Sequence, residues 1–354
     1  MPKIDSLFDK LIEQGGSDLH LEQGQKPKIR LHGELNEMEG LDVLTEESLV
    51  GLMEEIASKD WWQKYLETGD LDFAYAYEDK ARFRANYFRH FYGYGCIFRI
   101  IPSEILSLDK IGMPETLYEF ADYRSGLVLI TGPTGSGKST TLAAVIDHIN
   151  ASKTQRIITI EEPVEFLHSN KQSVITHREV GLDTDSFTSG LRGAIKSDTN
   201  VILVGEMRDQ ETISLALKAA EMGILVFGTL HTNSAAKTVD RIIDVFPANQ
   251  KNQVRSVLAN TLTGIVAQQL LKSADGARRW VSYEILLRTT SLPSIIRAGE
   301  TVKLTSEIQL NKQRGMILMD DCLRQLVSEG KVAQSEAYLK ALDKASFMDV
   351  GTTL

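Results

Sequence analysis

Nine consecutive residues, Gly-Pro-Thr-Gly-Ser-Gly-Lys-Ser-Thr at 132–140, leave little freedom in how the middle of this chain can fold. An apolar run at 127–130 precedes them and a helix-compatible run at 141–146 follows, which is the strand, loop and helix order of a nucleotide-binding P-loop. A simple glycine-rich turn would need neither the lysine–serine pair nor four residues between Gly132 and Gly137. The stretch therefore predicts a phosphate-binding loop that opens a helix.

The residue types of this loop match what a nucleotide needs. Glycines allow a tight turn with its N–H groups aimed inward, where they and the helix N-terminus surround phosphate oxygens. Lys138 is expected to reach the β- and γ-phosphates, and Ser139 to bind Mg²⁺. The residues predicted to bind ATP are Gly132, Thr134, Gly135, Ser136, Gly137, Lys138, Ser139 and Thr140.

Length and composition limit the remaining possibilities. With 354 residues, 42% of them hydrophobic, the chain is long enough for two domains that each bury a core. A net charge of −9 and a pI near 5.4 argue against a nucleic-acid machine, so no nucleic-acid partner is expected. Two cysteines, Cys96 and Cys322, are too few for a disulfide framework or a four-cysteine zinc site. No apolar run approaches the length of a membrane span, so we expect a cytoplasmic protein that docks on membranes through partners.

The first third of the sequence predicts a small α/β domain at 1–101. Alternating and helical patterns place helices at 3–14 and 45–67, and strands at 17–21, 27–33, 70–77, 81–89 and 94–101. Within 82–88, Arg82, Arg84 and Asn86 fall on one strand face and apolar side chains on the other. Glycine and proline at 102–118 suggest a linker, and the P-loop domain is expected to fill 119–354.

The P-loop domain is predicted to contain a parallel sheet covered by helices. Buried strands are expected at 127–130, 156–160, 201–204 and 224–227. Polar clusters follow three of them, at 161–165, 205–209 and 228–233. Because ligands gather beyond the carboxyl ends of parallel strands, these clusters should lie beside the nucleotide.

Hydrolysis of a γ-phosphate needs charge neutralisation by a metal, a positioned water and positive charge in the transition state. Glu206 suits the carboxylate on the metal side. One of Glu161, Glu162 and Glu165 is expected to polarise the attacking water, and spacing alone does not choose among them. His231 is a candidate sensor of the γ-phosphate. Arg84 and Arg99 are candidates for an arginine supplied by a neighbouring subunit.

Several motifs, in this order, resemble the PilT-type retraction ATPases of type IV pili, within the superfamily of hexameric secretion ATPases. The resemblance covers almost the whole chain. The motifs that carry it lie at 15–21, 82–84, 98–102, 132–140, 159–165, 204–209, 228–234 and 240–247.

The resemblance implies a PAS-like N-terminal domain joined to a RecA-like ATPase domain, both of the α/β class. It implies an ATP-hydrolysing, Mg²⁺-dependent homohexamer that drives pilus retraction and twitching motility. Its partners would be an inner-membrane platform protein and, indirectly, pilin, so the protein would dock at the inner membrane. Residue by residue, Glu165 matches the catalytic glutamate, Glu206 the Walker B glutamate that also acts on the metal, and His231 the His box. Arg84 and Arg99 match arginines that approach the nucleotide from the N-terminal domain.

The chain departs from the family pattern at three places. Glu162 replaces an aspartate and keeps its charge. Lys196 replaces an arginine, which removes a bidentate donor. In the segment 291–300 the family carries two arginines in a motif needed for retraction; here Arg297 matches the second, but Pro293 stands at the first. This last change leaves a paralogous or accessory retraction ATPase open.

Three other functions remain to be weighed. A pilus extension or type II secretion ATPase of the same superfamily usually has a longer N-terminal extension and a four-cysteine zinc module, which 354 residues with two cysteines do not match. A RecA-like nucleic-acid motor is disfavoured by the acidic charge. A nucleotide-gated assembly protein would bind ATP without turnover, and an ATPase assay would identify it.

Overall fold

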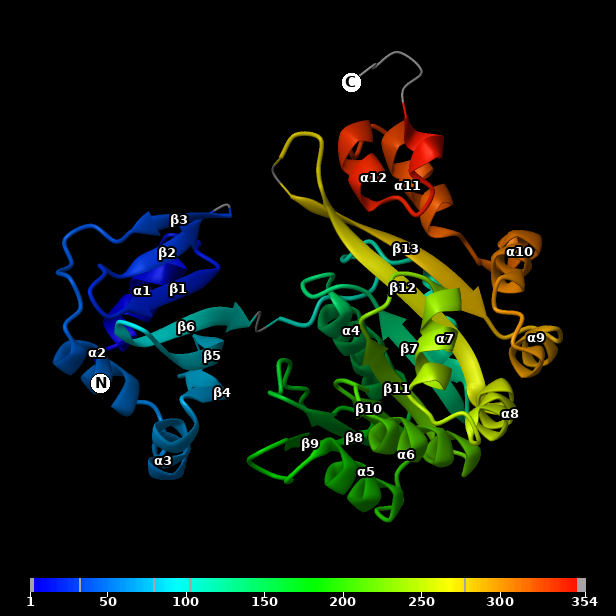
Figure 1. Ribbon diagram of the computed structural model, residues 1–354, viewed down its shortest axis with the longest axis horizontal. Helices are drawn as coiled ribbons and strands as arrows, with labels where there is room; N and C mark the ends of the chain where they lie inside the picture. Colours follow the sequence, from blue (N-terminus) through cyan, green and yellow to red (C-terminus); the bar gives the residue numbers. More distant parts are fainter. Residues whose placement is uncertain (1–2, 32, 79, 102–103, 277, 349–354) are drawn as a thin grey trace. The chain divides into compact units, whose positions relative to one another are not determined.

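The structure is a computed structural model that describes residues 3–31, 33–78, 80–101, 104–276 and 278–348. The chain divides into two compact units (Figure 1). The first takes in Met1–Glu104 and Glu162–Leu167, and the second Ile105–Glu161 and His168–Leu354. Both units combine helices with a sheet, which confirms the predicted α/β class. Pro102 and Ser103 of the predicted linker lie outside the described residues.

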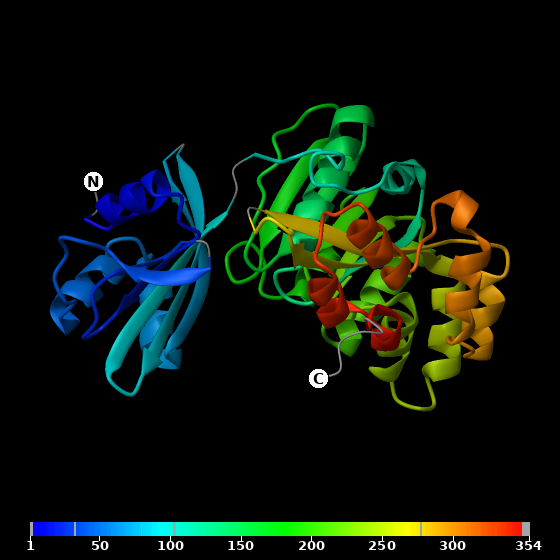
Figure 2. The same cartoon turned by 90° about the horizontal axis from the view of Figure 1, so that it is seen from above.

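The first unit is built on a six-stranded antiparallel sheet in the order β3-β2-β1-β6-β5-β4. Its elements are α1 (Asp5–Glu13), β1 (Asp18–Glu22), β2 (Lys28–Leu31), β3 (Glu34–Glu37), α2 (Glu46–Glu54), α3 (Lys59–Thr68), β4 (Asp70–Tyr77), β5 (Ala81–His90) and β6 (Gly93–Ile101). Along β5, apolar side chains are buried and Arg82, Arg84 and Asn86 are partly exposed, as the alternation predicted. Phe8 of α1 stacks on Phe83, so α1 closes one face of this sheet (Figure 2).

The helical stretch predicted at 45–67 is present, but the structure divides it into two helices. Thr45 and Ser58 are the N-caps of α2 and α3, and each side chain accepts a hydrogen bond from a backbone N–H of the helix it begins. A serine or threonine side chain favours a helix start over a helix interior, since its oxygen satisfies an otherwise unpaired backbone donor. Ser58 therefore marks a break that hydrophobic spacing alone does not show.

The second unit contains a seven-stranded sheet in the order β13-β12-β7-β11-β10-β8-β9. Its strands are β7 (Gly126–Thr131), β8 (Arg156–Glu161), β9 (Val174–Glu179), β10 (Val201–Val204), β11 (Leu225–Leu230), β12 (Leu262–Lys272) and β13 (Arg279–Leu287). Its α-helices are α4 (Lys138–Ser152), α5 (Phe187–Ile195), α6 (Gln210–Glu221), α7 (Ala235–Asp244), α8 (Lys251–Thr261), α9 (Leu292–Ala298), α10 (Lys303–Leu310), α11 (Met319–Ser328) and α12 (Gln334–Lys340). Short 3-10 turns occupy η1 (Glu115–Asp122), η2 (Lys312–Arg314) and η3 (Lys344–Phe347).

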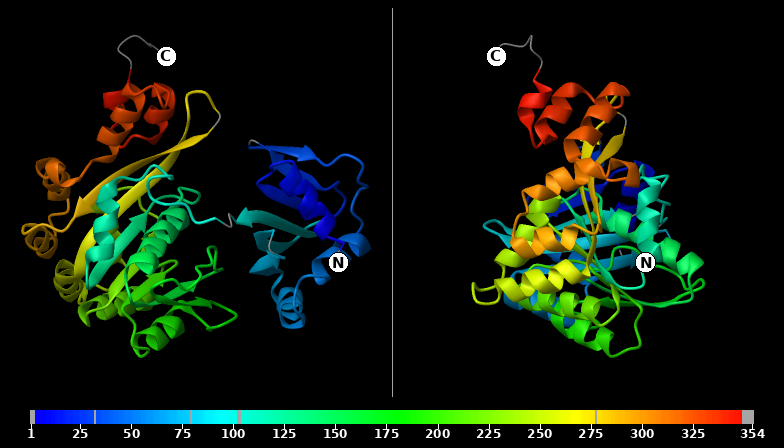
Figure 3. Two further views of the ribbon diagram at one scale, coloured as in Figure 1. Left: turned by 180° about the vertical axis from the view of Figure 1, so that it is seen from behind. Right: turned by 90° about the vertical axis from the view of Figure 1, so that its right-hand side faces the viewer.

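The four predicted strands of this unit are present and run parallel. All six residues of β7 are buried, as expected of a central parallel strand covered on both faces. The fourth strand differs in extent, because β11 continues to Leu230 and takes in the Gly228-Thr229-Leu230 segment predicted to follow it. Among the strands described for this sheet, only β13 is antiparallel to its neighbour, β12. The long β12–β13 hairpin carries α11 and α12 near its tip (yellow and red in Figures 1 and 3).

Strand β13 contains a carboxylate in the core of the unit. Glu284 is 4% exposed, and it accepts hydrogen bonds from the backbone N–H of Ala235 at 2.7 Å and of Met319 at 3.4 Å. These donors are the first residues of α7 and α11, where a helix leaves N–H groups without intrahelical partners. Burial raises the pKa of Glu284, and the two backbone donors act against that rise. The Glu284 carboxylate therefore links the N-terminus of α7 to that of α11 through two hydrogen bonds.

Among the described residues, no helix combines the length and the apolar content that crossing a bilayer requires.

Candidate active site

The predicted phosphate loop connects β7 to α4. Gly132, Gly135 and Gly137 have φ values of +148°, +77° and +87°, which side chains other than glycine rarely adopt. Helix α4 begins at Lys138, and its N-cap residue Gly137 makes no side-chain capping hydrogen bond. The N-terminus of a helix after a glycine-rich loop favours an anion. The ammonium of Lys138 donates to the carbonyl oxygens of Gly132 at 3.0 Å and Pro133 at 3.1 Å. The lysine side chain therefore contacts the backbone of the same loop with which it is predicted to bind phosphate.

The loop rests on β12, which the sequence analysis did not predict. Gln268 is buried, and its Nε2 donates to the carbonyl oxygen of Ser136 at 2.7 Å. A Cβ atom at Gly132 would lie 2.2 Å from the carbonyl oxygen of Gln268, so only glycine fits against this strand. Gln268 therefore holds the phosphate loop against β12.

A carboxylate and an imidazole meet beside β10 and β11. Glu206 follows β10 and His231 follows β11, and the two strands are parallel neighbours. His231 Nε2 lies 2.9 Å from Glu206 Oε1, and Arg208 Nη2 donates to Glu206 Oε2 at 2.6 Å. Burial acts to raise the pKa of Glu206, but the hydrogen bond and charge of Arg208, followed by His231, outweigh it and lower that pKa. Glu206 is therefore an ionised carboxylate, and the two predicted residues lie together.

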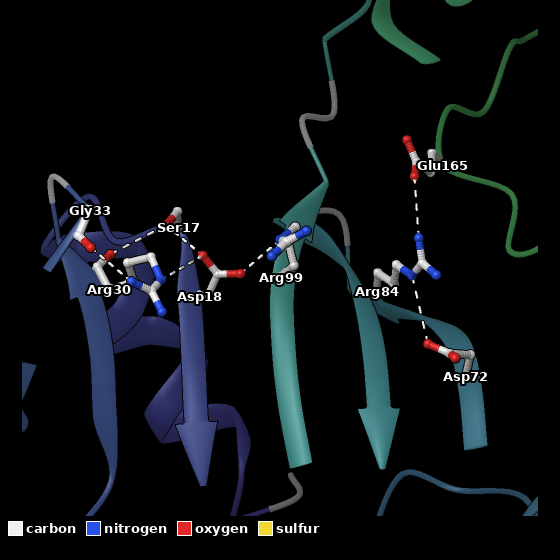
Figure 4. Close-up of polar contacts among 8 residues, drawn as sticks. All are labelled: Ser17, Asp18, Arg30, Gly33, Asp72, Arg84, Arg99 and Glu165. Carbon is white, nitrogen blue, oxygen red and sulfur yellow. Dashed lines mark hydrogen bonds and ion pairs between the residues drawn. The ribbon is translucent and has the colours of Figure 1, made fainter. Parts of the chain in front are cut away.

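In the first unit, a row of charged side chains crosses one face of the sheet (Figure 4). Arg84 and Arg99 are direct cross-strand partners on β5 and β6, and Asp18 and Arg30 continue the row on β1 and β2. Arg99 Nε donates to the buried Asp18 at 2.7 Å, and Ser17 Oγ donates to the same carboxylate at 2.6 Å. Asp18, which was not predicted as a site residue, thus holds one predicted arginine in place.

Glu165 belongs to Glu162–Leu167, the segment that groups with the first unit. Its Oε1 lies 3.9 Å from Arg84 Nη1, and Arg84 Nε lies 3.7 Å from Asp72 (Figure 4). Partly exposed ion pairs at such distances contribute little stability. Glu165 is partly buried whereas Glu162 is exposed. The assignment of Glu165 as the catalytic carboxylate stays a prediction, as do the roles of Arg84 and Arg99.

The loop, the parallel sheet and the carboxylate at the end of β10 define a P-loop nucleotide-binding protein of the α/β class. The family of type II/IV secretion system proteins matches residues 1–335, and this chain belongs to that family. The motif resemblance noted in the sequence is thereby confirmed.

Individual relatives match along nearly their whole length. The type IV pilus retraction ATPase PilT of Pseudomonas aeruginosa is 44% identical over 96% of this chain and 98% of its own. The type IV pilus ATPase PilU of the same organism is 35% identical over 96% of this chain and 88% of its own. A crystal structure of the pilus retraction motor PilT with bound ADP superposes with a TM-score of 0.89, at 40% identity over 97% of this chain and 98% of that one.

Proposed function

We propose that this protein is an ATP-hydrolysing motor, assembled as a homohexamer, that drives type IV pilus retraction and thereby twitching motility. The observation that carries the proposal is the 44% identity to a retraction ATPase over nearly the full length of both chains. The phosphate loop with Lys138, and the ionised Glu206 beside His231, supply the nucleotide chemistry that such a motor needs.

Nucleotide binding is assigned to the residues of the second unit. The N–H groups of 132–137 and the start of α4 would surround the phosphates, and Lys138 would exchange its loop carbonyls for phosphate oxygens. The hydroxyl of Ser139 and the ionised carboxylate of Glu206 are hard oxygen donors of the kind Mg²⁺ prefers, so the chain fits this ion. When bound, Mg²⁺ supplies charge neutralisation on the β- and γ-phosphates.

Hydrolysis is assigned to residues of both units. Glu165 would take a proton from the attacking water, and His231, already hydrogen-bonded to Glu206, would sense the γ-phosphate. Arg84 and Arg99 would supply positive charge in the transition state, from within the ring of subunits. The domains are proposed as 1–101, the linker 102–118 and 119–354.

The motor would work in the cytoplasm, docked at the inner membrane on a platform protein and acting on pilin through it. A paralogous or accessory retraction ATPase is the second candidate, and Pro293 is the observation that favours it. Pro293 lies in the first turn of α9, where proline is tolerated, so the helix forms without the arginine of the family motif. Arg297 keeps a partner, because its Nη2 donates to Asn260 Oδ1 at 2.7 Å.

The proposal is tested by measuring ATPase activity of the full chain against protein concentration while light scattering reports its mass. A specific activity that rises with the shift from monomer to hexamer, and that Glu165→Ala abolishes, supports a ring with composite sites. Turnover by a monomer, independent of concentration, contradicts it.

In the organism, loss and restoration of twitching on deletion and complementation would separate the main motor from an accessory one, whose deletion leaves twitching in place.

A further inference from the structure

We propose that Asn150 of α4 and His177 of β9 are positioning residues for hydrolysis. They fasten the segment His168–Ser173, called here the loop anchor, which directly follows the segment carrying Glu165. The inference rests on the proposed function, because it takes Glu165 as the group that activates water.

The segment Glu162–Leu167 is bounded upstream by β8 and downstream by the loop anchor. On the upstream side, Glu161 ends β8 and its carbonyl oxygen accepts from the N–H of Val180 at 2.8 Å. The preceding carbonyl, of Ile160, accepts from Gly205 at 2.8 Å. The segment therefore leaves the sheet from a fixed point, and the way its downstream end is held is one further constraint on its position.

His177 holds the first residue of the loop anchor. The backbone N–H of His168 donates to His177 Nε2 at 3.1 Å, and His177 Nδ1 lies 2.9 Å from Thr159 Oγ1. Because Nε2 accepts, His177 is neutral with its proton on Nδ1, which donates to the threonine hydroxyl. The His168 ring is buried and stacks on His177 with an interplanar angle of 12°. Burial, followed by the neighbouring His177, lowers the pKa of His168 to about 4, so this ring is also neutral near pH 7.

Asn150 holds the remainder of the loop anchor. It is fully buried; its Nδ2 donates to Ser169 O at 2.8 Å, and its Oδ1 accepts from the N–H of Lys171 at 3.1 Å. Its backbone carbonyl accepts from the N–H groups of Gln172 and Ser173 at 2.9 and 3.2 Å. One helical residue thus pairs with four backbone groups of the loop.

The helix that fastens the loop also opens at the phosphate loop. Asn150 lies 12 residues beyond Lys138 on α4, or about 18 Å at roughly 1.5 Å per residue. A single rigid element therefore sets the position of the phosphate loop and of the downstream end of the segment that carries Glu165. A displacement of about 1 Å in a catalytic group can lower the rate about 100-fold. A loop anchor that is held less firmly should therefore lower kcat.

The test compares Asn150→Ala and His177→Leu with two matched controls in the full-length protein. Ser152→Ala removes an exposed hydroxyl from the same helix end, and His177→Gln keeps an acceptor for the His168 N–H. We expect Asn150→Ala and His177→Leu to lower kcat by about 10- to 100-fold, with the dissociation constant for ADP within about twofold of wild type. Hydrogen exchange should quicken across 168–175 and stay unchanged across 132–140, and both controls should resemble wild type.

Two results would overturn the inference: faster exchange at 168–175 with unchanged kcat, or unchanged exchange in both variants. If Asn150→Ala fails to fold, the comparison of His177→Leu with His177→Gln still tests the inference. Glutamine keeps an acceptor for the His168 N–H, and leucine does not. Glu165→Gln is run in parallel. Full activity of Glu165→Gln refutes the catalytic assignment in the proposed function, whereas an inactive Glu165→Gln beside a fully active His177→Leu refutes the loop anchor alone.

Discussion

Replacing Glu284 by alanine should destabilise the second unit far more than replacing it by glutamine. Alanine removes the acceptor of two buried N–H groups, those of Ala235 and Met319, and leaves a cavity. A hydrogen bond to a charged acceptor contributes about 1.5–3 kcal/mol, and removal of the buried charge returns part of that sum. We therefore expect a loss of about 2–4 kcal/mol, which for a unit of this size lowers Tm by roughly 4–16 °C.

Glutamine separates the hydrogen bond from the charge. Its Oε1 can still accept from Ala235, the closer donor, while the longer bond to Met319 is lost, so the expected loss is under about 1 kcal/mol. The assay is thermal unfolding of the full-length variants at pH 7, followed by calorimetry. An alanine variant within about 2 °C of wild type, or a glutamine variant as unstable as alanine, would refute this reasoning.

The same carboxylate gives a pH dependence with a definite sign. Burial raises the folded-state pKa of Glu284 above its ordinary value of 4.5, so the folded protein binds this proton more tightly than the unfolded chain does. Its contribution to stability is fully present below pH 4.5 and is lost as pH rises through the folded pKa. The Tm of wild type relative to Glu284→Gln should therefore increase as pH is lowered from 7 towards 4.5.

Three further predictions concern the phosphate loop, the first unit and the catalytic carboxylate. Gln268→Leu leaves a loop carbonyl without its donor, at a cost of about 1–3 kcal/mol, and should raise the ADP dissociation constant about 5- to 150-fold in a fluorescent-ADP titration. Gln269→Leu on the same strand is the control, and equal effects would contradict the role of Gln268. Burial acts to raise the pKa of Asp18, but hydrogen bonds lower it overall, so its stabilisation is present above pH 3.8 and lost as pH falls further. Acid unfolding of the first unit should be steeper in wild type than in Asp18→Asn, and identical acid curves would count against the ion pair. Glu165→Ala should reduce ATP hydrolysis by at least about 100-fold while ADP binding persists, and Glu162→Ala should do much less; equal losses would reverse the assignment.

The phosphate loop and the four central strands could be predicted because each depends on neighbouring residues. The glycine pattern at 132–137 and the fully apolar run of β7 carry their conformation in their own sequence. By contrast, β12 reads Leu-Thr-Gly-Ile-Val-Ala-Gln-Gln-Leu-Leu-Lys, which suits a buried helix or a strand equally well. Pairing with β7, which is far away in sequence, and with β13 across the hairpin decides between them.

The site shows the same division. Glu206 and His231 were predicted together because both follow strands of one parallel sheet, whose ends meet at one edge. Gln268, Asp18 and Asn150 could not be recognised, since each acts on a backbone group or a side chain supplied by another element. A buried polar residue in an apolar stretch was the available signal, but sequence does not say which partner satisfies it.

Two adjacent glutamines on β12 have a mechanical consequence. Gln268 donates to Ser136 in the phosphate loop, and Gln269, whose side chain points to the opposite face of the strand, donates to the carbonyl oxygen of Lys340 at the end of α12 at 3.2 Å. The residue that contacts the phosphate loop and the residue that contacts the C-terminal helices are therefore neighbours in the chain. A pull on α12 that tilts or slides this strand would also strain the phosphate loop, so β12 offers a direct path by which external force on those helices would reach the nucleotide.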